Sequence, residues 1–380
     1  MAREIQQEQP QRGSAGSATP SRWTAAQLTC CKRAAQAPII ADSDVVPISN
    51  ELGFWDAWPV QELSAEPAGF PDGRELWMAL GAKRFPDPAE RHHHARIHLI
   101  LRDGGSWRDL GPAMPEGFSP GSREWSGSAV LQRRTVTLYF TAAGKRDEAI
   151  PGFEQRLVSA QALLEYGEVP RLTSWRDLRE IVTPNPQWYA PTSTAIPTAA
   201  GLQAFRDPAY FFDLLEGREY IFFAASLPHP QAAFSGAVGA ARKVISGGWE
   251  LLPPVVSAEG LNNELERPHV VRHSGLYYLF WSTQTHVFNP SGPSGPTGLY
   301  GMVAESLLGE WRPLNGSGMV FSNPESAPNQ AYAWLVLPDL SVTSFVDQWN
   351  SSHQLEPRFG GTFAPFLRLR LRGDRAELAE

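Results

Sequence analysis

Two aspartates with unusual neighbours are the first candidates for chemistry in this sequence. Asp56 lies between Trp55 and, two residues on, Trp58, so its carboxylate is expected in an aromatic, apolar rim. Asp207 directly follows Arg206, whose positive charge would keep that carboxylate ionised by Coulomb attraction. Taken alone, each residue is better explained as the aspartate of an ordinary turn, so neither identifies a site without further partners.

A third acidic segment, residues 263–271, contains Glu264 and Glu266. In an extended strand, residues two positions apart point to the same face. Two carboxylates on one face repel each other, which raises the pKa of one of them. A raised pKa is what a general acid needs near neutral pH, although a solvated edge strand would also carry such charges.

Together these three segments supply at least three carboxylates, two arginines and flanking tryptophans. This set suits glycosyl transfer, in which one carboxylate attacks the anomeric carbon and an acid protonates the leaving oxygen. A third carboxylate can balance the developing positive charge or bind sugar hydroxyls. Indole faces stack on sugar rings and guanidinium groups donate to hydroxyls. The sequence therefore indicates a carbohydrate-active site.

The elements that must position these residues are mostly short strands. From Ile39 onward, runs of about four to seven residues are bounded by Gly, Pro, Asn or Asp. Helical windows are few: 154–165 is the best, and 24–34 predicts a short helix capped near Ser21 or Thr24. This texture favours an all-β fold, and a β-propeller suits the length, although no internal repeat gives the number of blades. The expected strands include 96–101, 129–131, 135–141, 220–224, 269–272, 276–281, 298–303, 333–337, 341–346 and 366–371.

Composition excludes several other classes of protein. The 380 residues include 33 Lys or Arg and 40 Asp or Glu, and the net charge of −7 argues against nucleic-acid or anionic-membrane partners. No run approaches the roughly 18 apolar residues of a membrane span. Cys30 and Cys31 are adjacent, which fits neither a disulfide scaffold nor a structural zinc site. Serine-hydrolase, zinc-protease, P-loop and dinucleotide-binding motifs are absent.

The chain resembles glycoside hydrolase family 68, the levansucrases, inulosucrases and related β-fructofuranosidases. The resemblance covers about residues 21–371 and implies a five-bladed β-propeller with a deep axial pocket. We therefore expect a single catalytic domain over 21–380, including the short N-terminal helix, after a disordered segment over 1–20. The matching pieces, in family order, are Ser21-Arg22-Trp23-Thr24, Trp55-Asp56-Ala57-Trp58-Pro59, Glu124-Trp125-Ser126-Gly127-Ser128-Ala129, Phe205-Arg206-Asp207-Pro208, Glu264-Leu265-Glu266-Arg267-Pro268-His269, Gly295-Pro296-Thr297-Gly298-Leu299-Tyr300-Gly301 and Gly360-Gly361-Thr362-Phe363-Ala364-Pro365.

The resemblance implies a role for each matched residue. Asp56 would be the nucleophile, Asp207 the transition-state stabiliser and Glu266 the general acid/base of a retaining transfer that needs no cofactor. Glu266 is then the member of the glutamate pair expected to have the raised pKa, with Arg267 limiting the rise. Residues matching the sucrose pocket are Trp55, Trp125, Ser126, Arg206, Glu264 and Arg267.

The implied reaction cleaves sucrose, releases glucose and passes the fructosyl unit to fructan, sucrose or water. The expected partners are therefore sucrose and fructan or oligosaccharide acceptors, with no nucleic acid and no membrane. Family members act outside the cell, whereas the N-terminus shows no apolar core of a conventional signal peptide.

Two positions depart from the family pattern. Asn263 stands where many members have an aspartate that helps to hold calcium, so we expect no metal there. Gln284 stands near where levan-forming members often have Arg or His beside the acceptor sugar, although His286 could be the true counterpart. A neutral amide there favours hydrolysis or short transfer products over long polymers.

Other conspicuous residues are expected to be structural. The run from His92 to His94 is predicted to be a polar loop, because neighbours in an extended chain point to opposite faces and cannot all bind one ion. His98 alternates with apolar residues and is predicted to be a hydrogen-bonded strand histidine. Two other functions stay open: an inverting five-bladed glycosidase of the arabinanase type, and a non-catalytic sugar-binding propeller.

Overall fold

The computed structural model describes residues 19–29, 35–192, 202–228, 234–349 and 358–379. Within these ranges the regular structure is mostly β-strand, with one α-helix, α1 (Ala25–Leu28), and four short 3₁₀ segments. Their bounds are Asp42–Asp44 (η1), Pro88–His93 (η2), Thr285–Val287 (η3) and Leu314–Gly316 (η4). The described helices are all too short to cross a membrane.

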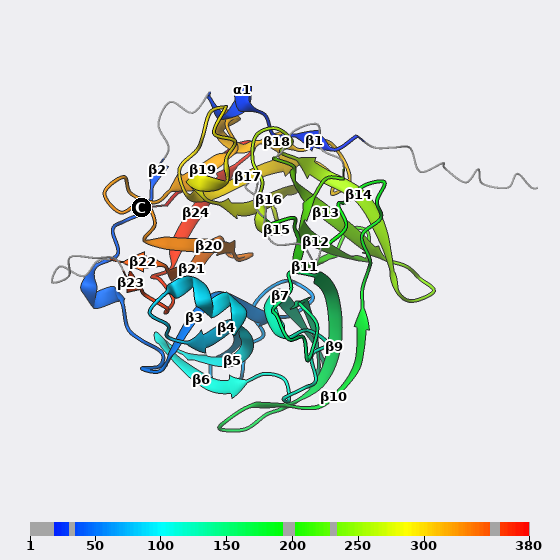
Figure 1. Ribbon diagram of the computed structural model, residues 1–380, viewed down its shortest axis with the longest axis vertical. Helices are drawn as coiled ribbons and strands as arrows, with labels where there is room; N and C mark the ends of the chain where they lie inside the picture. The colour runs from blue at the N-terminus through cyan, green and yellow to red at the C-terminus, as the bar shows by residue number, and fades with distance from the viewer. Residues whose placement is uncertain (1–18, 30–34, 193–201, 229–233, 350–357, 380) are drawn as a thin grey trace, which may run out of the picture.

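The strands form five blades of antiparallel sheet arranged around an axis (Figure 1). Along the chain, each blade is built outward from its first strand. The blades consist of β3 (Leu52–Gln61), β4 (Glu75–Lys83), β5 (Arg96–Asp103) and β6 (Ser106–Pro112); β7 (Arg123–Gln132), β8 (Thr135–Ala143), β9 (Gln155–Glu165) and β10 (Arg171–Glu180); β11 (Phe205–Asp213), β12 (Arg218–Ser226), β13 (Gly236–Lys243) and β14 (Trp249–Ser257); β15 (Glu266–His273), β16 (Leu276–Thr283), β17 (Gly298–Ala304) and β19 (Met319–Ser322); and β20 (Ala331–Val336), β21 (Ser341–Val346), β24 (Leu367–Arg372) and β25 (Arg375–Leu378). We call them blades I to V in that order.

The first strands of the blades, β3, β7, β11, β15 and β20, form the inner ring. Each contacts the first strand of the next blade, and β20 contacts β3, which closes the ring. Strands β3 and β7 also pair directly in parallel, with Val60 opposite Ala129. Short strands β18 (Arg312–Pro313), β22 (Gln348–Trp349) and β23 (Arg358–Phe359) lie outside the four-stranded blades. The expected all-β five-bladed propeller is therefore confirmed.

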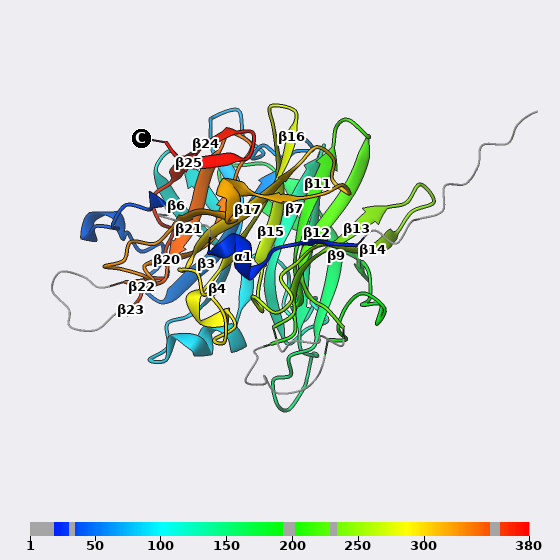
Figure 2. The ribbon, with the colours of Figure 1, turned by 90° about the horizontal axis from the view of Figure 1, so that it is seen from above.

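The N-terminal segment crosses the outer edges of two blades (Figure 2). Strand β1 (Ser21–Arg22) pairs in parallel with β14 of blade III, and β2 (Ala35–Gln36) pairs in parallel with β19 of blade IV. Between them, Trp23 is buried against Trp281 and Tyr300. Pairing of this kind covers strand edges that would otherwise be free to bind other chains.

The expected short helix near the N-terminus is present as α1. It begins after Thr24, whose side chain accepts a hydrogen bond from Gln27 N while the Gln27 side chain accepts one from Thr24 N. Four residues are helical, fewer than the window 24–34 predicted, and residues 30–34 lie outside the described ranges, as do Cys30, Cys31 and most of the expected disordered segment 1–20.

The helix predicted over 154–165 is wrong, because this segment forms strand β9. Strand β9 pairs with β8 along its length, from Gln155 opposite Ala143 to Leu163 opposite Thr135. Three successive side chains, Leu157, Val158 and Ser159, are buried, which requires cover on both faces of the sheet. Helix propensity is a weak preference, and burial between neighbouring blades overrides it.

Candidate active site

A break in strand pairing at one level of the inner ring creates the site. Every inner strand shifts register against its neighbour at this level: between Trp55 and Trp58, Trp125 and Gly127, Arg206 and Ala209, Glu266 and His269, and Tyr332 and Leu335. Bulges of this kind redirect side chains and are common beside active sites. They are a fivefold structural repeat that the sequence does not display.

Four of these bulges contain a non-glycine residue in the left-handed region. The φ angles are 50° at Asp56, 62° at Asp207, 49° at Arg267 and 55° at Ala333. Such conformations cost free energy for residues with a side chain and persist where the surroundings enforce them. Two of the three predicted catalytic acids are therefore held in strained backbone, and the third, Glu266, immediately precedes a strained residue.

The bulges line a cavity of about 380 Å³ that opens between the loops at one end of the propeller. Its wall includes every residue that the sequence assigned to the site, contributed by blades I to IV. These residues are Trp55, Asp56, Trp125, Ser126, Arg206, Asp207, Glu264, Glu266, Arg267 and Gln284. The trio of acids that are far apart in the sequence thus converges on one pocket.

Asp56 is oriented by a hydrogen bond from blade II. Ser126 Oγ donates to Asp56 Oδ2 at 2.5 Å. Burial raises the pKa of Asp56, and the charge of Arg267 and the Ser126 hydrogen bond oppose that rise, in that order. These groups therefore favour the ionised carboxylate that a nucleophile requires.

Asp207 lies deeper, with only 7% of its surface exposed. Its main-chain N–H donates to Thr141 Oγ1 at 2.9 Å, and its Oδ2 accepts from Arg267 N at 3.3 Å. Arg206 Nε is 3.7 Å from the same oxygen. Burial raises the pKa of Asp207 to about 7, with Arg206 the main opposing charge.

Glu264 and Glu266 share one arginine. Arg206 Nη2 is 2.7 Å from Glu266 Oε1 and 3.4 Å from Glu264 Oε2. The Tyr332 hydroxyl donates to Glu266 Oε2, and the two glutamates are also hydrogen-bonded to each other. The pair therefore forms one hydrogen-bonded acid network that joins blades III, IV and V.

The expectation that Glu266 has the raised pKa is wrong for the unliganded protein. Burial, together with the charge of Glu266, raises the pKa of Glu264 to about 8. Although burial also acts on Glu266, Arg206 and Tyr332 outweigh it and lower the pKa of Glu266. The proton of the pair thus lies on Glu264, because Arg206 is closer to Glu266. Arg206, and not Arg267, is the arginine that restrains the pKa of Glu266.

The sequence did not identify several residues that line the cavity. Tyr332 stands in an ordinary apolar strand, β20, and no local signal distinguishes it from other strand tyrosines. Arg91 lies with its guanidinium carbon 5.5 Å from the Trp55 ring centroid and 4.2 Å from that of Phe359. It is also 3.7 Å from Asp347. These contacts come from the outer loops of blades I and V, which only the closed ring brings together.

In the histidine run, which was predicted to be a polar loop, His92 and His93 end the short 3₁₀ segment η2, and His94 follows it. His92 and His93 line the cavity, and the His92 carbonyl accepts a hydrogen bond from Trp125 Nε1 at 3.2 Å. Across the described ranges, no group of three or more His, Cys, Asp or Glu is placed to hold a metal ion. The prediction for His98 is confirmed: it is buried, and its Nδ1 is 2.9 Å from Asp109 Oδ1.

Gln284 and His286, the two candidates for the acceptor site, both lie in the loop after β16 but differ in position. Gln284 lines the cavity, whereas His286 is exposed and does not. Of these two candidates, Gln284 is therefore the one whose position agrees with the expected acceptor site.

Comparison with known proteins gives consistent matches over nearly the whole chain. The family model described as Levansucrase/Invertase matches residues 13–241 and 229–380. Levansucrase LscA of Pseudomonas savastanoi pv. glycinea is 33% identical, over 90% of this chain and 89% of its own. Levansucrase of Rahnella aquatilis is 31% identical, over 94% of each chain.

Solved structures agree in fold. An inulosucrase from Halalkalicoccus jeotgali bound to kestose matches with a TM-score of 0.87 and 33% identity, over 95% of both chains. Levansucrase from Gluconacetobacter diazotrophicus matches with a TM-score of 0.81 over 96% of this chain and 90% of its own, and at 23% identity it supports the fold alone.

Proposed function

The chain belongs to the levansucrase/invertase family, and from this membership we propose that Asp56, Asp207 and Glu266 carry out a retaining fructosyl transfer from sucrose. The protein is a fructosyltransferase of the levansucrase type. The observation that carries the assignment of residues is the convergence of these three acids, each on a different blade, in one cavity.

In the first half-reaction, Asp56 attacks the anomeric carbon of the fructosyl unit. The bond between this carbon and the glucosyl oxygen breaks, and Glu266 gives its proton to that oxygen, so glucose leaves. A fructosyl ester on Asp56 remains. The Ser126 hydroxyl, which donates to one Asp56 oxygen, holds the carboxylate in place and leaves the other oxygen for attack.

In the second half-reaction, Glu266 acts as a base. It removes a proton from the hydroxyl of an acceptor, which is water, sucrose or a growing fructan, and the acceptor oxygen displaces Asp56. Two inversions give overall retention. Asp207, which lines the same cavity, balances the positive charge of the oxocarbenium-like transition state when ionised.

The glutamate pair supplies the proton for the first step. Because Glu264 carries the proton in the unliganded site and is hydrogen-bonded to Glu266, the proton can pass to Glu266 along that bond. Glu264 is therefore a proton source as well as a polar wall of the pocket. Trp125 provides indole surface for a sugar ring, whereas Trp55 lines the cavity with only 1% of the residue exposed.

The presence of Gln284 in the cavity favours the formation of short transfer products. It lines the cavity beside the acid/base, and a neutral amide binds an acceptor sugar by hydrogen bonds alone, without the charge of Arg. We therefore propose that water and small sugars compete well with long fructan chains as acceptors.

Incubation of the purified protein with sucrose tests this function. We expect free glucose in excess of free fructose, with the missing fructose in short oligosaccharides, and NMR of the first fructosyl product should show retained configuration. Equal glucose and fructose would indicate a hydrolase, an inverted product would indicate a different mechanism, and absence of glucose would exclude the proposed reaction.

A further inference from the structure

We propose that Arg267 is a positioning residue that fixes the three catalytic acids relative to one another, rather than a residue that contacts the sugar. This inference rests on the proposed function, because it takes Asp56, Asp207 and Glu266 to be the working acids.

The side chain of Arg267 joins two other blades. Its Nη2 donates to the Ala57 carbonyl at 2.8 Å and its Nη1 donates to the Ala333 carbonyl at 3.2 Å. Ala57 immediately follows Asp56 in blade I. Ala333 immediately follows Tyr332 in blade V, whose hydroxyl donates to Glu266. The guanidinium group therefore donates its hydrogen bonds to main-chain carbonyls beside the catalytic groups, and only 6% of the residue is exposed.

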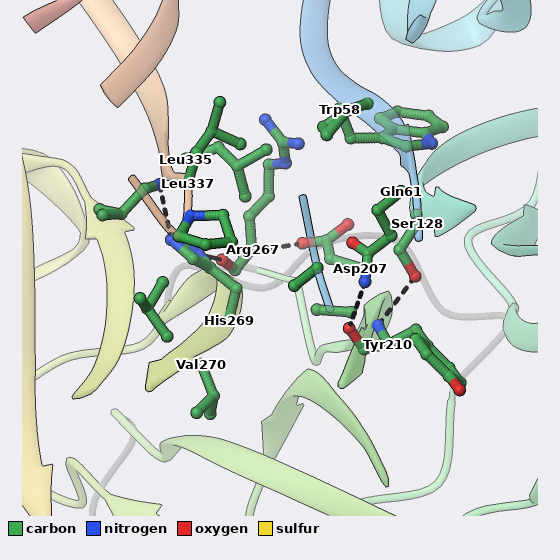
Figure 3. Close-up of a pocket in the computed structure, with 17 residues that line it drawn as sticks. Trp58, Gln61, Ser128, Asp207, Tyr210, Arg267, His269, Val270, Leu335 and Leu337 are labelled. Carbon is green, nitrogen blue, oxygen red and sulfur yellow. Dashed lines mark hydrogen bonds between the residues drawn. The ribbon is translucent and has the colours of Figure 1, made fainter. Parts of the chain in front are cut away.

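The main chain of Arg267 contacts Asp207 and is fixed in turn by a hydrogen bond from His269. Its N–H donates to Asp207 Oδ2, and its carbonyl accepts from His269 Nδ1 at 2.9 Å. His269 Nε2 accepts from Val336 N at 2.8 Å, so the ring must carry its hydrogen on Nδ1. Burial lowers the pKa of His269 to about 4, which keeps the ring neutral. Figure 3 shows this chain of contacts from Asp207 through Arg267 to His269.

The position of Arg267 in the wall of the cavity agrees with this role. Arg267 and Asp207 line both the open cavity and a second cavity of about 50 Å³. The smaller cavity lies along the inner strands and is lined also by Trp58, Ser128 and His269 (Figure 3). Arg267 and Asp207 are thus shared by the walls of the two cavities.

Arg267 also gives Asp56 its main favourable charge. Of the charged groups that face Asp56, Arg267 lowers its pKa most, and Arg91 lowers it less. The charges of Glu266 on β15, Asp207 on β11 and Asp347 after β21 act in the opposite direction. Because Asp207 also faces Arg267, loss of this cation raises the pKa of both aspartates.

The test compares Arg267→Met with Arg156→Met. Arg156 is a matched control because its Nη2 also donates to two main-chain carbonyls, of Pro120 at 3.0 Å and Gly144 at 2.8 Å, within blade II. For each variant we would measure thermal unfolding and the dependence of kcat/KM for sucrose on pH. Arg267→Met should lower kcat about a hundredfold, the size of effect expected from small misplacement of reacting groups. The acid limb of its pH profile, where kcat/KM falls as the pH is lowered, should move to higher pH by about one unit.

Arg156→Met should lower thermal stability and leave the acid limb in place. A third variant, Arg267→Lys, keeps the charge. Its single ammonium group cannot reproduce the geometry by which the planar guanidinium donates to two carbonyls at once. It should lower kcat by about tenfold with the acid limb shifted by less than roughly 0.3 pH units. Because it is conservative, Arg267→Lys decides the matter if Arg267→Met does not fold.

Three results would overturn the positioning role. One is an Arg267→Met enzyme whose acid limb stays in place while its stability falls as in Arg156→Met. Another is a large rise in KM for sucrose at unchanged kcat, which would make Arg267 a sugar contact. The third is wild-type kcat in Arg267→Lys. Failure of the wild-type enzyme to release glucose would instead refute the proposed function.

Discussion

The carboxylates of the pocket have two different surroundings. Around Asp56, several side chains stabilise one carboxylate, whereas around Arg206 one guanidinium group is shared by several carboxylates. Asp56 receives a hydrogen bond from Ser126 and the charge of Arg267 and Arg91. Across the pocket, Arg206 alone lies within 4 Å of Glu264, Glu266 and Asp207. The first arrangement offsets part of the rise that burial causes in the pKa of Asp56, whereas the second leaves more carboxylates than cations.

This difference matches the two kinds of chemistry. A carboxylate nucleophile must be ionised when it attacks, so a hydrogen-bond donor and nearby cations suit the role proposed for Asp56. An acid/base must gain and lose a proton, so a shortage of cations suits the glutamate pair, which retains one proton until its pKa of about 8 is reached. The substitutions below are designed to separate the two sides.

The largest effect is expected from removal of the nucleophile. Asp56→Ala leaves no group to attack the fructosyl carbon, so glucose release should fall by on the order of 10⁴-fold or more. Assay of glucose with circular dichroism of the variant would distinguish lost chemistry from lost fold. Turnover within about tenfold of wild type would exclude Asp56 as the nucleophile.

The next largest effect is expected from a substitution of Glu266, the proposed acid/base. Glu266→Gln cannot donate or accept the proton, so sucrose turnover should fall by about 10²- to 10⁴-fold with sucrose binding mostly retained in calorimetry. Fructosyl fluoride, whose leaving group needs no proton, should still give a burst of fluoride with Glu266→Gln and none with Asp56→Ala. Lost binding with normal residual turnover, or no burst, would contradict the acid role.

A smaller effect is expected from the partner glutamate. In Glu264→Gln the proton of the pair can lie only on Glu266, whose pKa is lowered by Arg206 and Tyr332. Wild-type kcat/KM should fall as pH rises through about 8, where Glu264 loses its proton. In the variant this alkaline limb should lie about one unit or more lower in pH. An unchanged alkaline limb would show that Glu264 does not hold the proton.

The smallest effect is expected from the hydrogen bond to Asp56. Ser126→Ala removes one donor to a carboxylate, so kcat/KM should fall roughly tenfold and the acid limb should rise by less than about one pH unit. Ser128→Ala is a matched control, because Ser128 Oγ bonds to the main chain of Pro208 and Tyr210 instead. A shift of equal size in both variants would mean that Ser126 acts through general packing.

Sequence reasoning predicted which residues line the site better than it predicted their electrostatics. Every residue assigned to the pocket lines it, because the family motifs that contain residues such as Trp125 and Ser126 can be matched along the sequence. By contrast, the pKa order of Glu264 and Glu266 was predicted the wrong way round. Local alternation places both on one face but says nothing of Arg206, about sixty residues away in the sequence, which lies closer to one of them.

The same distinction holds for the fold. Short strands bounded by turn residues indicated an all-β chain, yet 154–165 was predicted to be a helix because its composition suits one. Burial of β9 against β8 decided otherwise. The fivefold set of bulges and the contribution of Tyr332 also had no local signal.

By itself, then, the sequence determined which functional groups are available, the all-β class and the family. The closed ring decided which groups meet: the proton on Glu264, the carbonyl partners of Arg267 and the approach of Arg91 to Trp55. The physical reason is that residue type and spacing are local properties, whereas burial and the distance between charges are set by contacts between blades that are far apart along the chain.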